Sequence, residues 1–179
     1  MSGHSHWAGI KHKKEITDQK RGKIFSKLLT AVTAAARGEP NPDFNPRLRT
    51  AVQKAKDAKV PADNIERAIK KALDPSVAFE ELIMEAYGPG GAAILIEAVT
   101  DSKNRTIAEI KKILSDGGAK WAEPGSVRWA FEEKGEGFEP KFPQELGEGD
   151  GKKLGSLIEK LDEHSDVQEI YTNAKGAQV

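Results

Sequence analysis

The residues with the clearest chemistry are cations near the amino terminus. Between positions 11 and 27, seven lysine and arginine side chains stand against two acids, Glu15 and Asp18. Glycines at positions 3, 9 and 22 let backbone approach a surface closely, and Trp7 can stack on a base. This mixture is typical of phosphate binding, although lysine-rich helix surfaces also occur as plain solvated faces. The seven cations are Lys11, Lys13, Lys14, Lys20, Arg21, Lys23 and Lys27.

Other residue types that could do chemistry form no convincing arrangement. His4, His6 and His12 are spaced like metal ligands, but no cysteine or paired carboxylate accompanies them. The glycine-rich segment 88–91 lacks the following lysine and hydroxyl of a phosphate loop, and it joins two expected strands. With no cysteine in the chain and no Ser, His and carboxylate grouping, we expect a non-enzyme. We also expect no metal, no cofactor and no small-molecule substrate.

The charge is divided unevenly along a chain whose net charge is zero. Residues 1–75 hold 16 lysines and arginines against 8 acids, whereas residues 76–179 hold 12 against 20. This asymmetry predicts two domains, with a basic half that meets a polyanion and an acidic half. No apolar run approaches 18 residues, so we expect a cytoplasmic protein without a membrane partner.

The basic half reads as an irregular arm followed by three helices, each with one apolar and one basic stripe. A helix is expected over residues 17–37, and Gly38 with three nearby prolines ends it. Asn45 and Pro46 are a good cap and first-turn pair for the second helix, and the third is expected over residues 62–73. The cations expected to support the arm on these helices are Arg47, Arg49, Arg67 and Lys70.

The acidic half changes to strand-like periodicity. Strands are expected over residues 79–87 and 92–100, and a helix with Ile107 and Ile110 on its buried face follows. Arg105, near the start of that helix, completes the set of expected nucleic-acid contacts. A last helix with Leu154 and Leu161 and a closing strand end the pattern.

The segment between the two helices of this half reads less clearly. A hairpin-like pair is expected at residues 119–122 and 126–133, where Trp121, Trp129 and Phe131 read mostly as core. Residues 134–151 are rich in Gly, Pro and Glu and are expected to form a linker loop. The order ββαββαβ favours an α+β class, with a three-helix basic domain followed by a ferredoxin-like antiparallel α/β domain.

Several segments together resemble the YebC/PmpR family of regulatory proteins, whose mitochondrial relatives include a translational activator of cytochrome oxidase. They run in order along nearly the whole chain: GHSHWAGIKHKK, DQKRGKIFSKL, NPRLRTAVQKAK, DNIERAIKK, EAYGPGGAAILIEAVTD, NRTIAEIKK, GSVRWAFEEKG and DVQEIYTNA. The resemblance implies a helical domain joined to α/β domains and no known catalytic activity. Typical members carry a further α/β subdomain after GSVRWAFEEKG, so this chain is expected to be a short form lacking it.

The resemblance implies a regulator of gene expression, but it leaves the partner open. Some members are described as transcriptional regulators that bind DNA, and others act on translation at the ribosome, including the synthesis of proline-rich stretches. Phosphate contacts give affinity without sequence information, and structured RNA, such as ribosomal RNA, fits the residues as well as DNA does. The alternative is a protein-interaction module whose acidic domain docks on a basic ribosomal or transcription partner.

Overall fold

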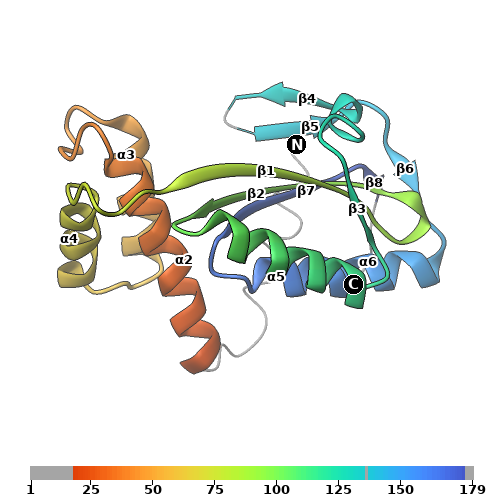
Figure 1. Cartoon of the computed structure of the whole chain (residues 1–179), viewed down its shortest axis with the longest axis horizontal. Coiled ribbons are helices and arrows are strands. Elements are labelled where there is room, and N and C mark those ends of the chain that lie inside the picture. Colours follow the sequence, from red (N-terminus) through yellow and green to blue (C-terminus); the bar gives the residue numbers. More distant parts are fainter. Residues whose placement is uncertain (1–17, 136, 176–179) are drawn as a thin grey trace.

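The computed structural model describes residues 18–135 and 137–175. Helices α2 (Asp18–Ala36), α3 (Pro46–Asp57) and α4 (Ala62–Lys71) gather at one end of an elongated molecule, and a layered α/β part forms the rest (Figure 1). The basic cations at positions 11, 13 and 14 lie outside the described residues.

The helical group is fixed by one asparagine at the junction between two helices. The Asn45 side chain accepts a hydrogen bond from the backbone nitrogen of Leu48 at 3.0 Å, which caps α3 as its sequence predicts. Its amide also donates to the carbonyl oxygens of Ala35 and Glu39, both at 2.7 Å. A single side chain therefore ties the end of α2 to the start of α3.

The three helices share one small core. Val32, Leu48, Ala55 and Ile65 are buried in it, so the apolar stripes read from the sequence do meet. The third helix is two residues shorter than expected: it ends at Lys71, and Leu73 lies exposed beyond it.

The α/β part is built on a sheet in which every neighbouring pair of strands is antiparallel. Strands β1 (Glu80–Tyr87) and β2 (Ala93–Thr100) form a hairpin across the 3-10 turn η1 (Pro89–Gly91), where Gly90 has a φ of 69°. Strand β3 (Lys120–Ala122) pairs with β1, and β7 (Val167–Thr172) pairs with β2. The resulting order is β3-β1-β2-β7.

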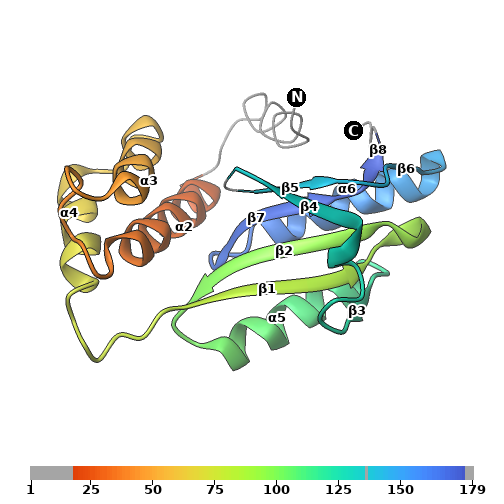
Figure 2. The ribbon, with the colours of Figure 1, turned by 90° about the horizontal axis from the view of Figure 1, so that it is seen from above.

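Helices α5 (Lys103–Asp116) and α6 (Glu148–Asp162) both lie on one face of this sheet (Figure 2). Ile94 and Ile96 of β2 point into the same apolar cluster as Leu114 of α5 and Leu154 of α6. Two helices on one face of an antiparallel sheet confirm the α+β class expected from the sequence.

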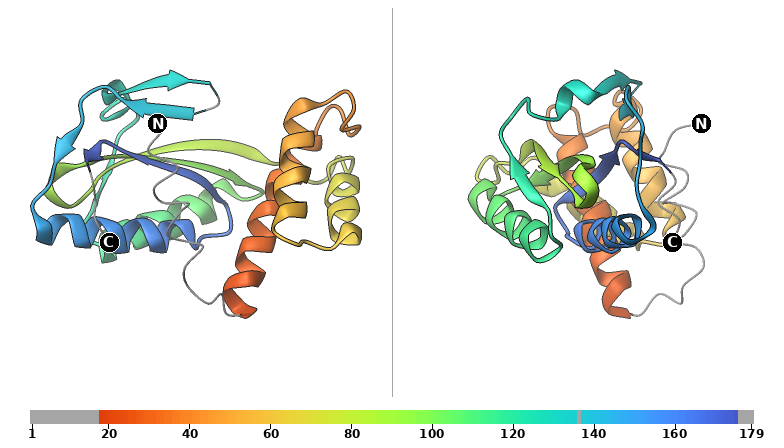
Figure 3. Two further views of the ribbon diagram at one scale, coloured as in Figure 1. Left: turned by 180° about the vertical axis from the view of Figure 1, so that it is seen from behind. Right: turned by 90° about the vertical axis from the view of Figure 1, so that its right-hand side faces the viewer.

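The face of the sheet opposite α5 and α6 is covered by the segment after β3, where the hairpin predicted from the sequence was wrong. Instead of a hairpin between residues 119–122 and 126–133, this segment forms the 3-10 turn η2 (Arg128–Ala130) and strand β4 (Phe131–Lys134). Strand β4 pairs with β5 (Gly137–Pro140), and β6 (Gln144–Glu145) pairs with β8 (Ala174–Lys175). The expected linker at residues 134–151 thus holds two strands and the first turn of α6. Phe138 of β5 is buried in an apolar cluster with Leu95 and Tyr171. Strands β4 and β5 lie over the face of the sheet opposite α5 and α6 (Figure 3).

Candidate nucleic-acid interface

Three of the expected cations form one stripe on α2. Lys20, Lys23 and Lys27 are three and four residues apart, so they lie on the same side of the helix. All three face the end of α6: Lys27 Nζ lies 2.7 Å from Asp162 Oδ1, and Lys20 and Lys23 lie 3.6 and 3.9 Å from Glu163. The structure therefore gathers these lysines against acids that are about 140 residues away in the sequence.

The physical reason for this contact is the strong negative charge at the end of α6. Asp162 and Glu163 stand at the carboxyl end of the helix, where the helix dipole already concentrates negative potential, and nearby cations offset both. The side chains of Lys27 and Asp162 are only 17% and 25% exposed, so that pair is the least screened. The two contacts with Glu163 are longer, and the side chains that make them are about half exposed. Solvent screens such ion pairs, so both contacts are weak.

The other expected cations of the helical group are not gathered with this stripe by any bond between described residues. Arg21 pairs with Asp18 of its own helix at 3.7 Å. Arg47 pairs with Glu81 of β1, and the guanidinium of Arg49 donates to the carbonyl oxygens of Pro42 and Asp43. On α4, Arg67 bonds to Asn64, and both Arg67 and Lys70 are exposed.

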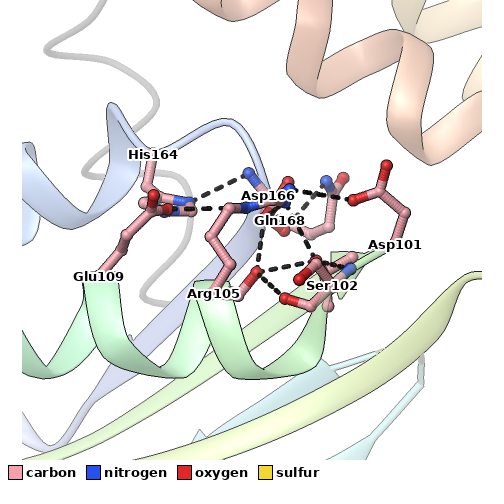
Figure 4. A network of polar contacts seen from close by, with 9 residues as sticks. Asp101, Ser102, Arg105, Glu109, His164, Asp166 and Gln168 are labelled. Atoms are coloured by element: carbon pink, nitrogen blue, oxygen red, sulfur yellow. Dashed lines mark hydrogen bonds and ion pairs between the residues drawn. The ribbon is translucent and has the colours of Figure 1, made fainter.

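Arg105 reaches the same turn between α6 and β7 from the other side, as part of a polar network (Figure 4). Its Nη2 lies 2.8 Å from Asp166 Oδ2, and its Nη1 lies 3.2 Å from Asp101. The Thr106 hydroxyl lies 2.6 Å from the same Asp166 oxygen, to which it donates. Because the Thr106 hydroxyl has a single proton and donates it to Asp166, it acts as the acceptor toward the Thr100 hydroxyl, which lies 2.8 Å away.

The charges in this network stabilise one another. Burial opposes the ionisation of Asp166, but the hydrogen bonds from Thr106 and Arg105 outweigh it and hold the pKa of Asp166 below its usual value. The same pairing with Asp166 raises the pKa of Arg105. His164 joins the network through both ring nitrogens: its Nδ1 accepts from the backbone nitrogen of Asp166, and its Nε2 lies 2.7 Å from Glu109 Oε2.

The turn at residues 162–166 is consequently a junction between the two parts of the molecule. Asp162 and Glu163 contact α2, while His164 and Asp166 contact α5. None of these pairings is visible in the sequence, because each joins residues more than 50 positions apart.

Of the three aromatics expected to lie mostly in the core, Trp129 is the exception. The Trp129 side chain is 63% exposed, whereas Phe131 is buried and Trp121 packs against the core. The 3-10 turn η2 turns Trp129 outward between the buried residues Val127 and Ala130. The sequence does hold a signal for this turn. Val127 and Ala130 are three residues apart, and that spacing fits a helical turn better than a strand.

Residues 18–135 and 137–175 hold neither a metal cluster nor a membrane-spanning helix. These residues contain no group of three or more His, Asp or Glu side chains placed to hold a metal ion. In the same ranges, no helix combines the length and the apolar character needed to span a bilayer.

Most of the chain matches the models of one protein family. Residues 5–74 match the model of the TACO1/YebC protein N-terminal domain, and residues 79–138 match that of the TACO1/YebC second and third domain. The chain belongs to the TACO1/YebC family. This membership confirms the resemblance read from the sequence motifs.

Relatives in this family carry the name "probable transcriptional regulatory protein". One from Dictyoglomus thermophilum is 52% identical over 141 residues, covering 77% of this chain and 57% of its own length. One from Desulfosudis oleivorans is 43% identical over 192 residues, covering 100% of this chain and 78% of its own length. The chain thus spans little more than half the length of the first of these relatives.

A solved structure has the same fold. It is the crystal structure of a conserved hypothetical protein from Aquifex aeolicus, with a TM-score of 0.85 and 32% sequence identity. The alignment covers 95% of this chain and 96% of that one.

Proposed function

We propose that this protein is a non-catalytic regulator of transcription that binds nucleic acid through the phosphates. The observation that carries the proposal is the stripe of Lys20, Lys23 and Lys27 on α2, which follows the cations of the preceding arm in the sequence. Three cations on one side of a helix can contact phosphates of one nucleic acid backbone together. The names of the relatives favour DNA and transcription, and they support the choice of duplex DNA as the first partner to test.

The proposed mechanism is an exchange of one set of anions for another. Asp162 and Glu163 neutralise the lysine stripe in the free protein, so a bound phosphate backbone takes over contacts that these acids make. The two contacts with Glu163 are weak enough to be exchanged at little cost. Lys11, Lys13 and Lys14 extend the proposed interface along the chain, and contacts through Arg67 and Lys70 of α4 remain predictions. Ribosomal RNA and the ribosome remain predictions, as does docking of the acidic part on a basic partner protein.

A salt series on a neutralised stripe tests the proposal. In the variant Lys20→Gln/Lys23→Gln, two phosphate contacts are lost, so we expect the slope of log affinity against log salt on duplex DNA to decrease by about 1 to 2. The matched control is Lys112→Gln/Lys152→Gln, which removes two exposed lysines paired with acids on α5 and α6. Fluorescence anisotropy gives the slope of each variant, once with duplex DNA and once with ribosomal RNA. Equal slopes for the two variants would show that the stripe binds no phosphate.

Removal of the competing acids should have the opposite effect. We expect Asp162→Asn/Glu163→Gln to bind duplex DNA about 5-fold to 30-fold more tightly, because ion pairs that oppose binding by about 1–2 kcal/mol in total are gone. The control is Asp116→Asn/Glu148→Gln, which makes the same change in net charge at exposed acids on α5 and α6. If both double variants gain affinity equally, the effect is one of net charge, and the exchange mechanism is wrong.

A further inference from the structure

Three exposed aromatic rings meet on the part of the molecule that covers the sheet face opposite α5 and α6. The exposed fractions of Trp129, Phe142 and Tyr87 are 63%, 58% and 41%. The rings of Trp129 and Phe142 are in contact, with centroids 5.6 Å apart and an angle of 49° between their planes. Tyr87 Oη and Trp129 Nε1 both donate to the carbonyl oxygen of Ser126, at 3.2 and 2.7 Å.

The rings are held in place by hydrogen bonds beneath them. The buried carboxylate of Glu85 accepts from the backbone nitrogens of Gly125, Val127 and Arg128, which fixes the loop that carries Ser126 and Trp129. On the other side, the Asn173 side chain donates to the carbonyl oxygen of Phe142 at 3.2 Å. Rings fixed in this way lose little conformational entropy on binding a flat partner.

Charged side chains of both signs surround the rings. Lys120 lies opposite Tyr87 in the pairing of β3 with β1, and Lys141 precedes Phe142. Both lysines are exposed, and neither forms an ion pair with another residue of the described ranges. Glu123 and Glu132 are exposed on the same segment, so the surface is electrically balanced. Its attraction for a nucleic acid would therefore come mainly from stacking, with two cations to contact phosphates.

We propose that Tyr87, Trp129 and Phe142 form a stacking site for unpaired bases of a single-stranded nucleic acid. The inference rests on the proposed function and narrows its ligand to one with an unpaired stretch. In a duplex, neighbouring base pairs cover the base faces, so exposed rings on a protein surface reach them only where the strands are open. Stacking accepts every base, so the site would add affinity without reading sequence.

Tryptophan fluorescence tests this proposal. The chain has three tryptophans, so the background Trp7→Phe/Trp121→Phe leaves Trp129 as the sole fluorophore. Titration with a ten-nucleotide thymidine oligomer should quench Trp129, whereas a fully paired duplex should not. In the same background, Phe142→Leu should lower the affinity for the oligomer by at least about fivefold, because leucine keeps the apolar surface but removes a stacking face. Phe44→Leu, at another exposed phenylalanine, should leave the affinity unchanged.

The outcomes separate this inference from the proposed function. The stacking site is supported if the oligomer quenches Trp129 and if Phe142→Leu lowers the affinity for the oligomer. No quenching, while Lys20 and Lys23 still determine the binding of duplex DNA, overturns the stacking site and leaves the proposed function standing. Equal affinity of the parent and Phe142→Leu for the oligomer would show that the Phe142 ring stacks on no base and would also overturn it. Circular dichroism of each variant verifies that the fold is intact.

Discussion

Replacing Glu85 by alanine is expected to lower the free energy of unfolding by about 3–5 kcal/mol. The Glu85 carboxylate is buried and accepts three backbone hydrogen bonds, from Gly125 at 2.6 Å, Val127 at 2.8 Å and Arg128 at 2.9 Å. Its loss leaves these donors without an acceptor beneath the loop that carries Trp129. Urea denaturation followed by circular dichroism measures the change.

The control for this prediction is a second glutamate of β1. Glu80 is exposed, so Glu80→Ala should change the free energy of unfolding by less than about 0.5 kcal/mol. If the two alanine variants were equally stable, the Glu85 carboxylate would not be holding the loop.

The stabilisation by Glu85 should depend on pH in a direction that follows from its pKa. Burial opposes ionisation of Glu85, but the three backbone donors and the charge of Arg128 outweigh it, so its pKa lies below the ordinary value of 4.5. A group with a depressed pKa in the folded state contributes fully above its unfolded pKa, and the contribution is lost as the pH falls through the folded pKa. The stability difference between the parent and Glu85→Gln should therefore shrink below about pH 4.5.

The second large effect is expected at the turn between α6 and β7. Replacement of Asp166 by alanine should lower the free energy of unfolding by about 3–4 kcal/mol, because the buried Thr106 hydroxyl and the Arg105 guanidinium lose their shared acceptor. The same turn carries Asp162 and Glu163, so its loosening should also weaken their contacts with α2.

An exposed aspartate on α5 provides the comparison. Within residues 18–135 and 137–175, Asp116 pairs only with Lys112 of its own helix. Asp116→Ala should therefore cost about 0.3–0.5 kcal/mol. Thermal or urea unfolding of both variants measures the difference. A cost for Asp166→Ala as small as that for Asp116→Ala would mean that the network in Figure 4 does not stabilise the fold.

Local signals in the sequence were sufficient for the elements that depend on local physics. The cap and first-turn pair of Asn45 and Pro46 marks the start of α3, and the apolar run of β2 reads correctly as a central strand. The helical periodicity around Ile110 likewise predicts α5. In each case, residues within one or two turns or one strand determine the element.

Features that depend on distant partners could not be read in this way. Composition at residues 134–151 indicates a loop, but Phe138 finds a place against Tyr171 of β7, with ring centroids 5.3 Å apart, and a strand forms there. The lysine stripe on α2 reads as solvated because nothing near it in sequence shows that Asp162 and Glu163 will contact it. The outward position of Trp129 similarly depends on the loop that Glu85 anchors from β1.

Lysine footprinting measures directly whether the lysine stripe of α2 contacts the nucleic acid. The protein would be acetylated with an amine-reactive reagent, free and saturated with duplex DNA or RNA, and the modification rate of each lysine read by mass spectrometry. Lys20 and Lys23 are about half exposed in the free protein, so both should react there. We predict that bound nucleic acid slows their modification and leaves Lys112 and Lys152 unaffected. Unchanged rates at Lys20 and Lys23 in a saturated complex would show that the stripe does not contact the nucleic acid.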